Sequence, residues 1–193
     1  TITITCYDSA DNICLDLRQS SLTTSSTNII NITDTTNNAI NFYGNGLNYP
    51  AVQFKRGNST GDINIYSAGS TFTLFKDSYP DCTNAHSIYW DPAGGDNNAT
   101  YTFGTGSGKG FIVDGASAAG KITLNSIGGT YKYNFVSLGS GASPNPVCDN
   151  VDVYNNAASP ANTFYTTGAI AATTTGWTGL GGGIKSLALL GVG

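Results

Sequence analysis

The sequence predicts an all-β protein, built as an antiparallel β-sandwich or jelly-roll-like domain. First, the strongest helix formers are scarce: Glu and Met do not occur, and Gln occurs only at Gln19 and Gln53. Second, the chain is rich in Thr, Ile, Val, Tyr and Phe, which favour pleated surfaces. Third, short alternating segments are separated by Gly, Asn, Asp and Ser clusters, which signal turns. A β-solenoid is the competing architecture, and no fixed repeat period in the sequence requires it.

The first segment, TITITC at 1–6, alternates Thr with Ile and predicts a strand. One side of this strand carries Ile2, Ile4 and Cys6, and the other side carries Thr1, Thr3 and Thr5. We interpret this beginning as that of a mature secreted chain from which a signal peptide has been removed. A strand in this position lies either at the edge of its own sheet or in the sheet of a neighbouring molecule.

The second segment, ICLDLR at 13–18, places Ile13, Leu15 and Leu17 on one face and is able to form a hairpin with the first. The hydroxyl-rich stretch QSSLTTSST that follows is either a linker or a strand edge. If it is a linker, the residues before it can leave the domain. We therefore expect an N-terminal strand and linker at 1–25 and a β-sandwich head at 26–193.

The head is expected to contain roughly a dozen short strands, the number and spacing typical of a sandwich. These strands fall at 26–33, 39–44, 49–56, 62–67, 71–76, 87–90, 99–104, 110–115, 120–127, 130–138, 150–156, 161–170 and 184–192. The last of them, IKSLALLGV, is almost entirely apolar, so we expect it to be covered on both faces.

Composition excludes several classes of function. The net charge is −4 and only eight Lys and Arg are scattered along the chain, which argues against a nucleic-acid partner. No apolar run has the length that spans a bilayer, so no membrane span is expected in the mature chain. The charged fraction is 10%, against about 25% in ordinary soluble domains, so solubility depends on hydroxyl and amide groups.

The four cysteines are an even number in a chain interpreted as secreted, which predicts two disulfides. Four cysteines allow three pairings. We favour Cys6 with Cys14, which closes a short loop, and Cys82 with Cys148. Free buried thiols are the alternative.

Catalytic and metal-binding patterns are weak, so we predict no enzyme, no metal and no cofactor other than N-linked glycans. His86 is the only histidine, and the neighbouring Asp81, Cys82 and Asp91 suggest a triad, but they fall in a turn-rich loop. The segments DSADN and DPAGGDNN offer oxygen ligands for calcium, yet they lack EF-hand spacing and are typical of Asx-rich turns.

Three triplets can accept N-linked glycans, beginning at Asn31, Asn58 and Asn98. Chance alone produces about four such triplets in a chain this rich in Asn, Ser and Thr. The case for glycosylation is therefore indirect: a secreted surface with almost no charge gains hydration from sugars.

Four aromatic residues are candidates for a sugar-binding platform: Tyr89, Trp90, Tyr101 and Trp177. The competing interpretation is that aromatic residues at alternate strand positions belong to the core, and this interpretation is favoured.

In overall character the chain resembles the secreted pilins of archaeal threads. The likeness rests on the strand TITIT at the start, the possible linker QSSLTTSST, the glycosylation triplets, the low charge and the apolar last strand. It differs from bacterial chaperone–usher pilins, because the C-terminal aromatic signature is replaced by Gly191, Val192 and Gly193.

The resemblance implies the structural subunit of an extracellular, cell-surface filament that serves adhesion. Copies of the chain would join head-to-tail when the N-terminal strand of one enters the sheet of the next. The implied donor residues are Thr1, Ile2, Thr3, Ile4, Thr5 and Cys6, with a possible continuation to Ile13, Leu15 and Leu17.

Two other functions compete with the filament. A monomeric secreted carbohydrate-binding module would use exposed aromatic residues and Asn/Asp loops. A jelly-roll capsid or surface-layer subunit would form closed shells or sheets. A glycan-active enzyme with paired Asp residues ranks last.

Overall fold

The computed structural model describes residues 2–6, 13–18, 29–34, 37–57, 59–78, 80–104, 110–138, 145 and 147–180. Every regular element among them is a strand, so the expected scarcity of helix is confirmed. None of the described residues forms a helix with the length and hydropathy needed to cross a bilayer.

The strands form three sheets. Sheet A contains β1 (Ile2–Cys6), β3 (Ile29–Asp34), β5 (Asn48–Lys55), β7 (Thr71–Ser78), β9 (Thr100–Phe103), β10 (Gly110–Asp114), β12 (Tyr133–Ser137) and β15 (Asn156–Ser159). Sheet B contains β2 (Ile13–Asp16), β4 (Ile40–Tyr43), β6 (Ile63–Tyr66), β8 (His86–Trp90), β11 (Ile122–Ser126) and β14 (Val151–Val153). Sheet C contains β13 (Val147–Cys148), β16 (Phe164–Thr166) and β17 (Trp177–Gly179).

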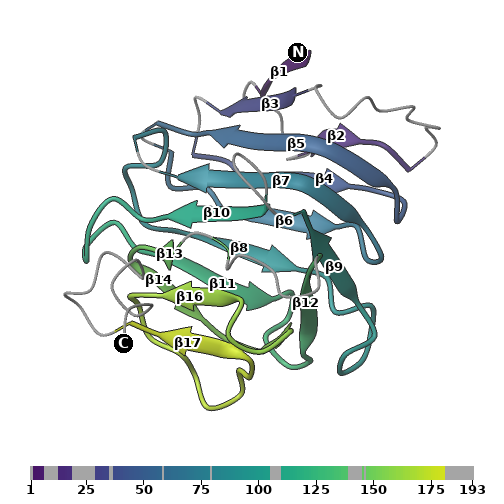
Figure 1. Ribbon diagram of the computed structural model, residues 1–193. Helices are drawn as coiled ribbons and strands as arrows, with labels where there is room; N and C mark the ends of the chain where they lie inside the picture. Colours follow the sequence, from purple (N-terminus) through teal and green to yellow (C-terminus); the bar gives the residue numbers. More distant parts are fainter. Residues whose placement is uncertain are drawn as a thin grey trace.

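All strand pairs in the three sheets are parallel, so the predicted antiparallel sandwich or jelly roll is wrong. From β1 to β9 the chain alternates between sheets A and B, and each return adds a strand beside the previous one. Figure 1 shows the resulting stack, with β1 at one end and β17 at the other. The chain is therefore a β-solenoid, the competing architecture.

Variable coil length explains why no repeat is visible in the sequence. Aligned positions of sheet A are 22 residues apart from Ile30 to Val52, 23 from Val52 to Phe75 and 36 from Phe75 to Phe111. The longest of these steps follows a fork at β7, where Thr71 and Phe72 pair with β9 and residues 74–78 pair with β10. Insertions at such corners preserve the stacking but remove any constant period.

The inward side chains of successive strands stack into a continuous core. In sheet B the register aligns Ile40, Ile63, Ile88 and Leu124, all of which are buried. Aromatic rings fill another part of the interior, where the Trp90 ring lies 4.9 Å from that of Phe135 in an edge-to-face arrangement. Such ring pairs contribute about 0.5–1.5 kcal/mol beyond the area that they bury.

The two N-terminal strands belong to the stack. β1 pairs with β3 from Ile2 opposite Ile30 to Cys6 opposite Asp34, and β2 pairs with β4. Leu15 and Leu17 pack against the core of their own chain. The expected boundary between 1–25 and 26–193 falls on residues outside the described ones, as does Thr1, but the described strands on its two sides are paired.

Candidate functional site

The edge of sheet A at β1 is regular and uncharged. All five residues of β1 pair in register with β3, and the strand contains neither a charged residue nor a proline. Within the described part of the chain, no strand pairs with the other edge of β1. Natural sheet edges usually carry charges, prolines or bulges that prevent pairing with another molecule, and β1 has none of these protections.

The edge of sheet B at β2 is different. Its register shifts between Ile13 and Leu15, which marks a bulge or irregularity. Beside it, Arg18 Nε donates to Asp16 Oδ1 at 2.9 Å, and the Arg18 guanidinium lies 4.6 Å from the centre of the Tyr43 ring. Hydrogen bonds from Arg18 lower the pKa of the exposed Asp16 carboxyl to about 2. This edge therefore carries both a bulge and a charge pair, two devices that discourage pairing.

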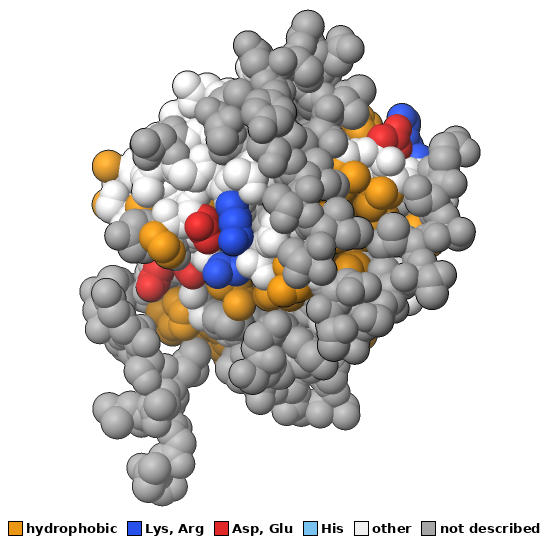
Figure 2. All heavy atoms as spheres, turned by 90° about the horizontal axis from the view of Figure 1, so that it is seen from above, with side chains coloured by type: hydrophobic (Ala, Val, Ile, Leu, Met, Phe, Trp, Pro, Cys, Tyr) orange, Lys and Arg blue, Asp and Glu red, His pale blue; other side chains and the backbone are white. Residues whose placement is uncertain are grey.

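The opposite end of the stack is formed by β17. β17 pairs with β16 on one side only among the described residues, and its sequence, Trp177–Gly179, is uncharged. In Figure 1, β3, β5, β7, β10, β13, β16 and β17 follow one another down the same face from β1. Figure 2 views the molecule from the β1 end and shows charged side chains of the described residues only in a few separate patches. Both ends of this face thus present an uncharged, parallel strand edge.

A buried polar cluster lies at the corner between β7 and β8, where Asp77, Cys82 and His86 meet. Asp77 Oδ2 is 2.6 Å from His86 Nε2, and Asp77 Oδ1 accepts a hydrogen bond from the Cys82 thiol. The other imidazole nitrogen, Nδ1, lies 2.9 Å from the carbonyl oxygen of Asn84. Both ring nitrogens thus lie within hydrogen-bonding distance of an oxygen atom, so the imidazole is held on two sides.

The geometry of this cluster does not support nucleophilic catalysis. The Asp77 carboxylate lies between the thiol and the imidazole, so His86 is not placed to remove the Cys82 proton. The pKa of the Cys82 thiol is raised far above its usual range, mainly by burial and to a smaller extent by the nearby charge of Asp77.

The same three residues are the one group of metal-ligating type found among the described residues, with ligand atoms within 4.8 Å of one another. Their mutual hydrogen bonds already use both carboxylate oxygens, and the Asp77 and His86 side chains have no exposed surface. The cluster is best explained as a buried hydrogen-bond network that stabilises the corner between β7 and β8.

The sequence indicated His86 and Cys82 as members of a polar cluster, but the acidic residues named from it were Asp81 and Asp91 instead of Asp77. Asp81 contributes its main-chain oxygen to Arg56 N and Gly57 N, and Asp91 accepts from Ala93 N in a separate turn. Asp77 was missed because it follows the strand expected at 71–76 and so falls at the start of the turn-rich loop. Its position becomes recognisable only in the fold, where Asp77 is a fully buried charged residue near the end of β7.

Cys82 and Cys148 are both buried free thiols, so the predicted disulfide between them is not formed. The Cys82 thiol donates a hydrogen bond to Asp77 of β7, whereas Cys148 belongs to β13, which lies beside β10. Because β10 pairs with β7, it separates the two thiols, and a disulfide needs its Cα atoms about 4.4–6.8 Å apart. The alternative of free thiols holds for this pair. Nothing is described of the side chains of Cys6 and Cys14.

The outer face of sheet B carries a row of amides and one tyrosine. The register aligns Asn41, Asn64, Tyr89 and Asn125 on successive strands. Asn64 Nδ2 donates to Asn41 Oδ1 at 2.8 Å, so this part of the row is linked across the strands. Beside it, the rings of Tyr43 and Tyr66 stack at 4.7 Å.

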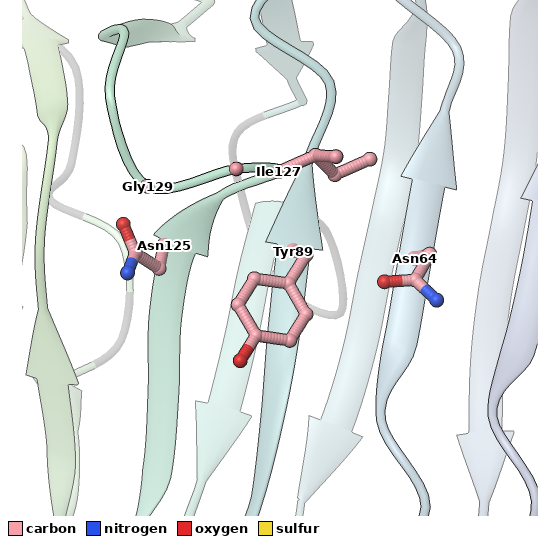
Figure 3. Close-up of a pocket in the computed structure, with 6 residues that line it drawn as sticks. Asn64, Tyr89, Asn125, Ile127 and Gly129 are labelled. Carbon is pink, nitrogen blue, oxygen red and sulfur yellow. The ribbon is translucent and has the colours of Figure 1, made fainter.

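This row borders a shallow hollow of about 440 Å³, whose lining residues are Asn64, Tyr89, Asn125, Ile127, Gly128 and Gly129. Figure 3 shows Tyr89 between Asn64 and Asn125, with Ile127 and Gly129 toward one end. Of the four aromatic candidates from the sequence, only Tyr89 lies here. Trp90, Tyr101 and Trp177 are buried in the core, as the favoured interpretation expected.

The glycosylation triplets fall in different surroundings. Asn98 is exposed in the loop between β8 and β9, whereas Asn31 is half-buried in the middle of β3. Asn58 lies outside the described residues. Occupancy by sugar remains a prediction at all three positions.

Comparisons with protein families, with curated proteins and with solved structures give no significant match to this chain.

Proposed function

We propose that the protein is the structural subunit of an extracellular, cell-surface filament, assembled end to end from copies of this chain. In this proposal the edge of β1 that has no partner among the described residues pairs with the corresponding edge of β17 in the next copy. The observation that carries it is the position of two uncharged, parallel edges at opposite ends of one face.

The direction of the strands makes this contact possible. The strand pairs within the two sheets of this face (Figure 1) are all parallel, so the next copy continues the pattern when it is placed further along the stack. The two edges are different surfaces, and a contact between different surfaces generates an open chain unless a rotation closes it into a ring. Repetition of this contact therefore builds a fibre.

The contact is expected to be weak for a single pair of molecules. Main-chain hydrogen bonds each contribute about 0.5–1.5 kcal/mol net, and these edges are short. The absence of charge on both edges removes the cost of desolvating ions. Assembly should therefore depend strongly on protein concentration, and it should resist salt.

Edge pairing differs from the strand insertion that the resemblance implies. Insertion of β1 into a neighbour requires β1 to leave β3, because the two strands are paired along their whole common length. Edge pairing keeps that register and uses the side of β1 that has no described partner. It also retains the partner expected from the sequence, a second copy of the same chain joined head-to-tail.

Lysines placed on β1 test the proposal, because edge lysines are a natural protection against pairing. The double variant Thr3→Lys/Thr5→Lys should abolish filaments in negative-stain electron microscopy and leave a monomer in sedimentation velocity. Thr123→Lys is the matched control, because it adds the same side chain to β11, a strand with partners on both sides. Filaments of normal length from the double variant, or no filaments from the wild type at any concentration, would refute end-to-end assembly.

A further inference from the structure

We propose that the hollow on the outer face of sheet B binds a neutral oligosaccharide, with Tyr89 as the stacking platform. Asn64 and Asn125, on the two strands that flank β8, would supply hydrogen bonds to the sugar hydroxyls. This site is independent of the strand edges and adds a ligand to a protein proposed above as a structural subunit.

The lining determines the class of ligand. None of the six lining residues is charged, so the hollow offers no opposite charge to compensate an ionised group. Amide side chains both donate and accept hydrogen bonds, as sugar hydroxyls do. A tyrosine ring combines an apolar face with a polar tip, which suits a ligand with apolar C–H faces and a polar rim.

The hollow is held in shape before any ligand arrives. Asn155 Nδ2 donates to Asn125 Oδ1 at 2.9 Å and to the Gly129 carbonyl oxygen at 3.0 Å. These two bonds fix both the amide of β11 and the turn that follows it. Because the carbonyl of Asn125 is used in this way, its Nδ2 group is the part of the amide available to a ligand.

The turn at Gly128 and Gly129 has no side chains, so it does not obstruct this end of the hollow. Both residues have positive φ, 77° and 66°, a conformation that favours glycine. No atom lies within 4 Å of the place where a side chain of Gly128 would begin. The end of the hollow is therefore a bare backbone turn that leaves room for a ligand longer than one sugar ring.

The aromatic surface continues beside the hollow. Asn64 lies on β6, two residues before Tyr66, whose ring stacks on Tyr43 of β4. Tyr89 and this stacked pair thus lie on neighbouring strands of one face. A chain of several sugars laid across the strands would meet both, so affinity should rise with oligosaccharide length.

Binding is tested with three neutral hexasaccharides, cellohexaose, laminarihexaose and maltohexaose, by isothermal titration calorimetry. A hexamer of galacturonic acid serves as the charged comparison. We expect at least one neutral glucan to bind, more tightly than the charged hexamer. Tyr89→Ala should weaken that binding at least tenfold, and Asn64→Ala should weaken it by a smaller factor.

Tyr131→Ala is the matched control, because it removes an exposed tyrosine that does not line the hollow. Thermal unfolding of each variant shows whether the fold is kept, and Asn64→Ala replaces Tyr89→Ala as the decisive variant if the latter unfolds. The proposal is overturned if no neutral hexasaccharide binds, if the charged hexamer binds more tightly, or if Tyr131→Ala weakens binding as much as Tyr89→Ala.

Discussion

Strand β8 has a polar region on each of its two sides. The two regions differ in where their hydrogen bonds are directed. On the inner side, His86 forms part of the cluster in which Asp77 and Cys82 bond to one another. On the outer side, Tyr89 faces a hollow between two amides. The inner region directs its hydrogen bonds toward its own members, whereas the outer region directs part of its hydrogen-bonding capacity toward solvent.

This difference separates groups that hold the fold from groups that are available to a ligand. A buried polar group without a partner costs about 1–3 kcal/mol, and more if it is charged, so an internal cluster must be complete. An outward group has water as its alternative partner, so its removal costs little stability. Substitutions on the inner side should therefore change unfolding, and substitutions on the outer side should change binding.

The largest expected effect comes from breaking the inner cluster. Asp77→Ala removes the acceptor of both His86 and Cys82 and leaves their donors buried. A buried polar group left without a partner costs about 1–3 kcal/mol, so we expect a loss of at least about that size in the free energy of unfolding, measured by urea denaturation. Asp77→Asn, which keeps one acceptor, should lose less.

Lys121→Ala is the control for this experiment, because it breaks a partly exposed pair in which Lys121 Nζ lies 3.2 Å from Asp152 Oδ2. Such pairs contribute about 0–1 kcal/mol. If Asp77→Ala costs no more than Lys121→Ala, the inner cluster does not hold the corner.

The next expected effect concerns the two buried thiols. Burial is the main cause that raises the pKa of both Cys82 and Cys148, so very little thiolate is present in the folded protein at pH 8. Iodoacetamide should label these residues at least about 100-fold more slowly in the native protein than in urea, as followed by peptide mass spectrometry.

The labelling also distinguishes free thiols from the disulfide that the sequence favoured. Free thiols become reactive as soon as the chain unfolds, without any reductant. A disulfide between Cys82 and Cys148 would leave both unlabelled in urea until reductant is added, which would contradict the structure at this corner.

The sequence identified the type of most elements but not how they pair. The alternation in INIY and INFY predicted strands correctly, because side-chain period reflects burial on one face. Parallel and antiparallel neighbours impose the same alternation on a half-buried strand, so the direction of pairing leaves no trace in it. The repeat that would have revealed a solenoid is hidden by coils of 22 to 36 residues, such as those from Ile30 to Val52 and from Phe75 to Phe111.

The candidate sites were predictable only in part, for a related reason. Tyr89 could be named from the sequence as a possible platform, but its outward position depends on the register that aligns it with Asn64 and Asn125. Trp90 is adjacent in sequence and points into the core, so one residue separates a ligand candidate from a core residue. Asp77 and His86 meet because the chain turns between β7 and β8. No regular sequence spacing predicts such a contact.

The smallest expected effect tests whether a partly buried carboxyl limits stability. Burial is the main cause that raises the pKa of Asp114, and repulsion from Asp149 adds to it. A carboxyl whose pKa is raised by folding holds its proton longer in the native state, so stability falls as pH rises from below the unfolded pKa of 3.8 through the native pKa. At neutral pH this loss is complete.

Asp114→Asn removes that loss of stability. It also keeps the hydrogen bond that Asp149 N donates to Asp114 Oδ1 at 3.0 Å, because an amide oxygen can accept in the same way. We expect a gain of about 0.5 kcal/mol at pH 7, the size usual for substitutions outside the core, and a smaller gain at pH 3. Asp96→Asn is the control, since the exposed Asp96 also accepts a main-chain hydrogen bond, from Lys132 N at 2.7 Å. A gain for Asp114→Asn that grows on acidification would have the wrong sign for a desolvated carboxylate and would exclude burial as its cause.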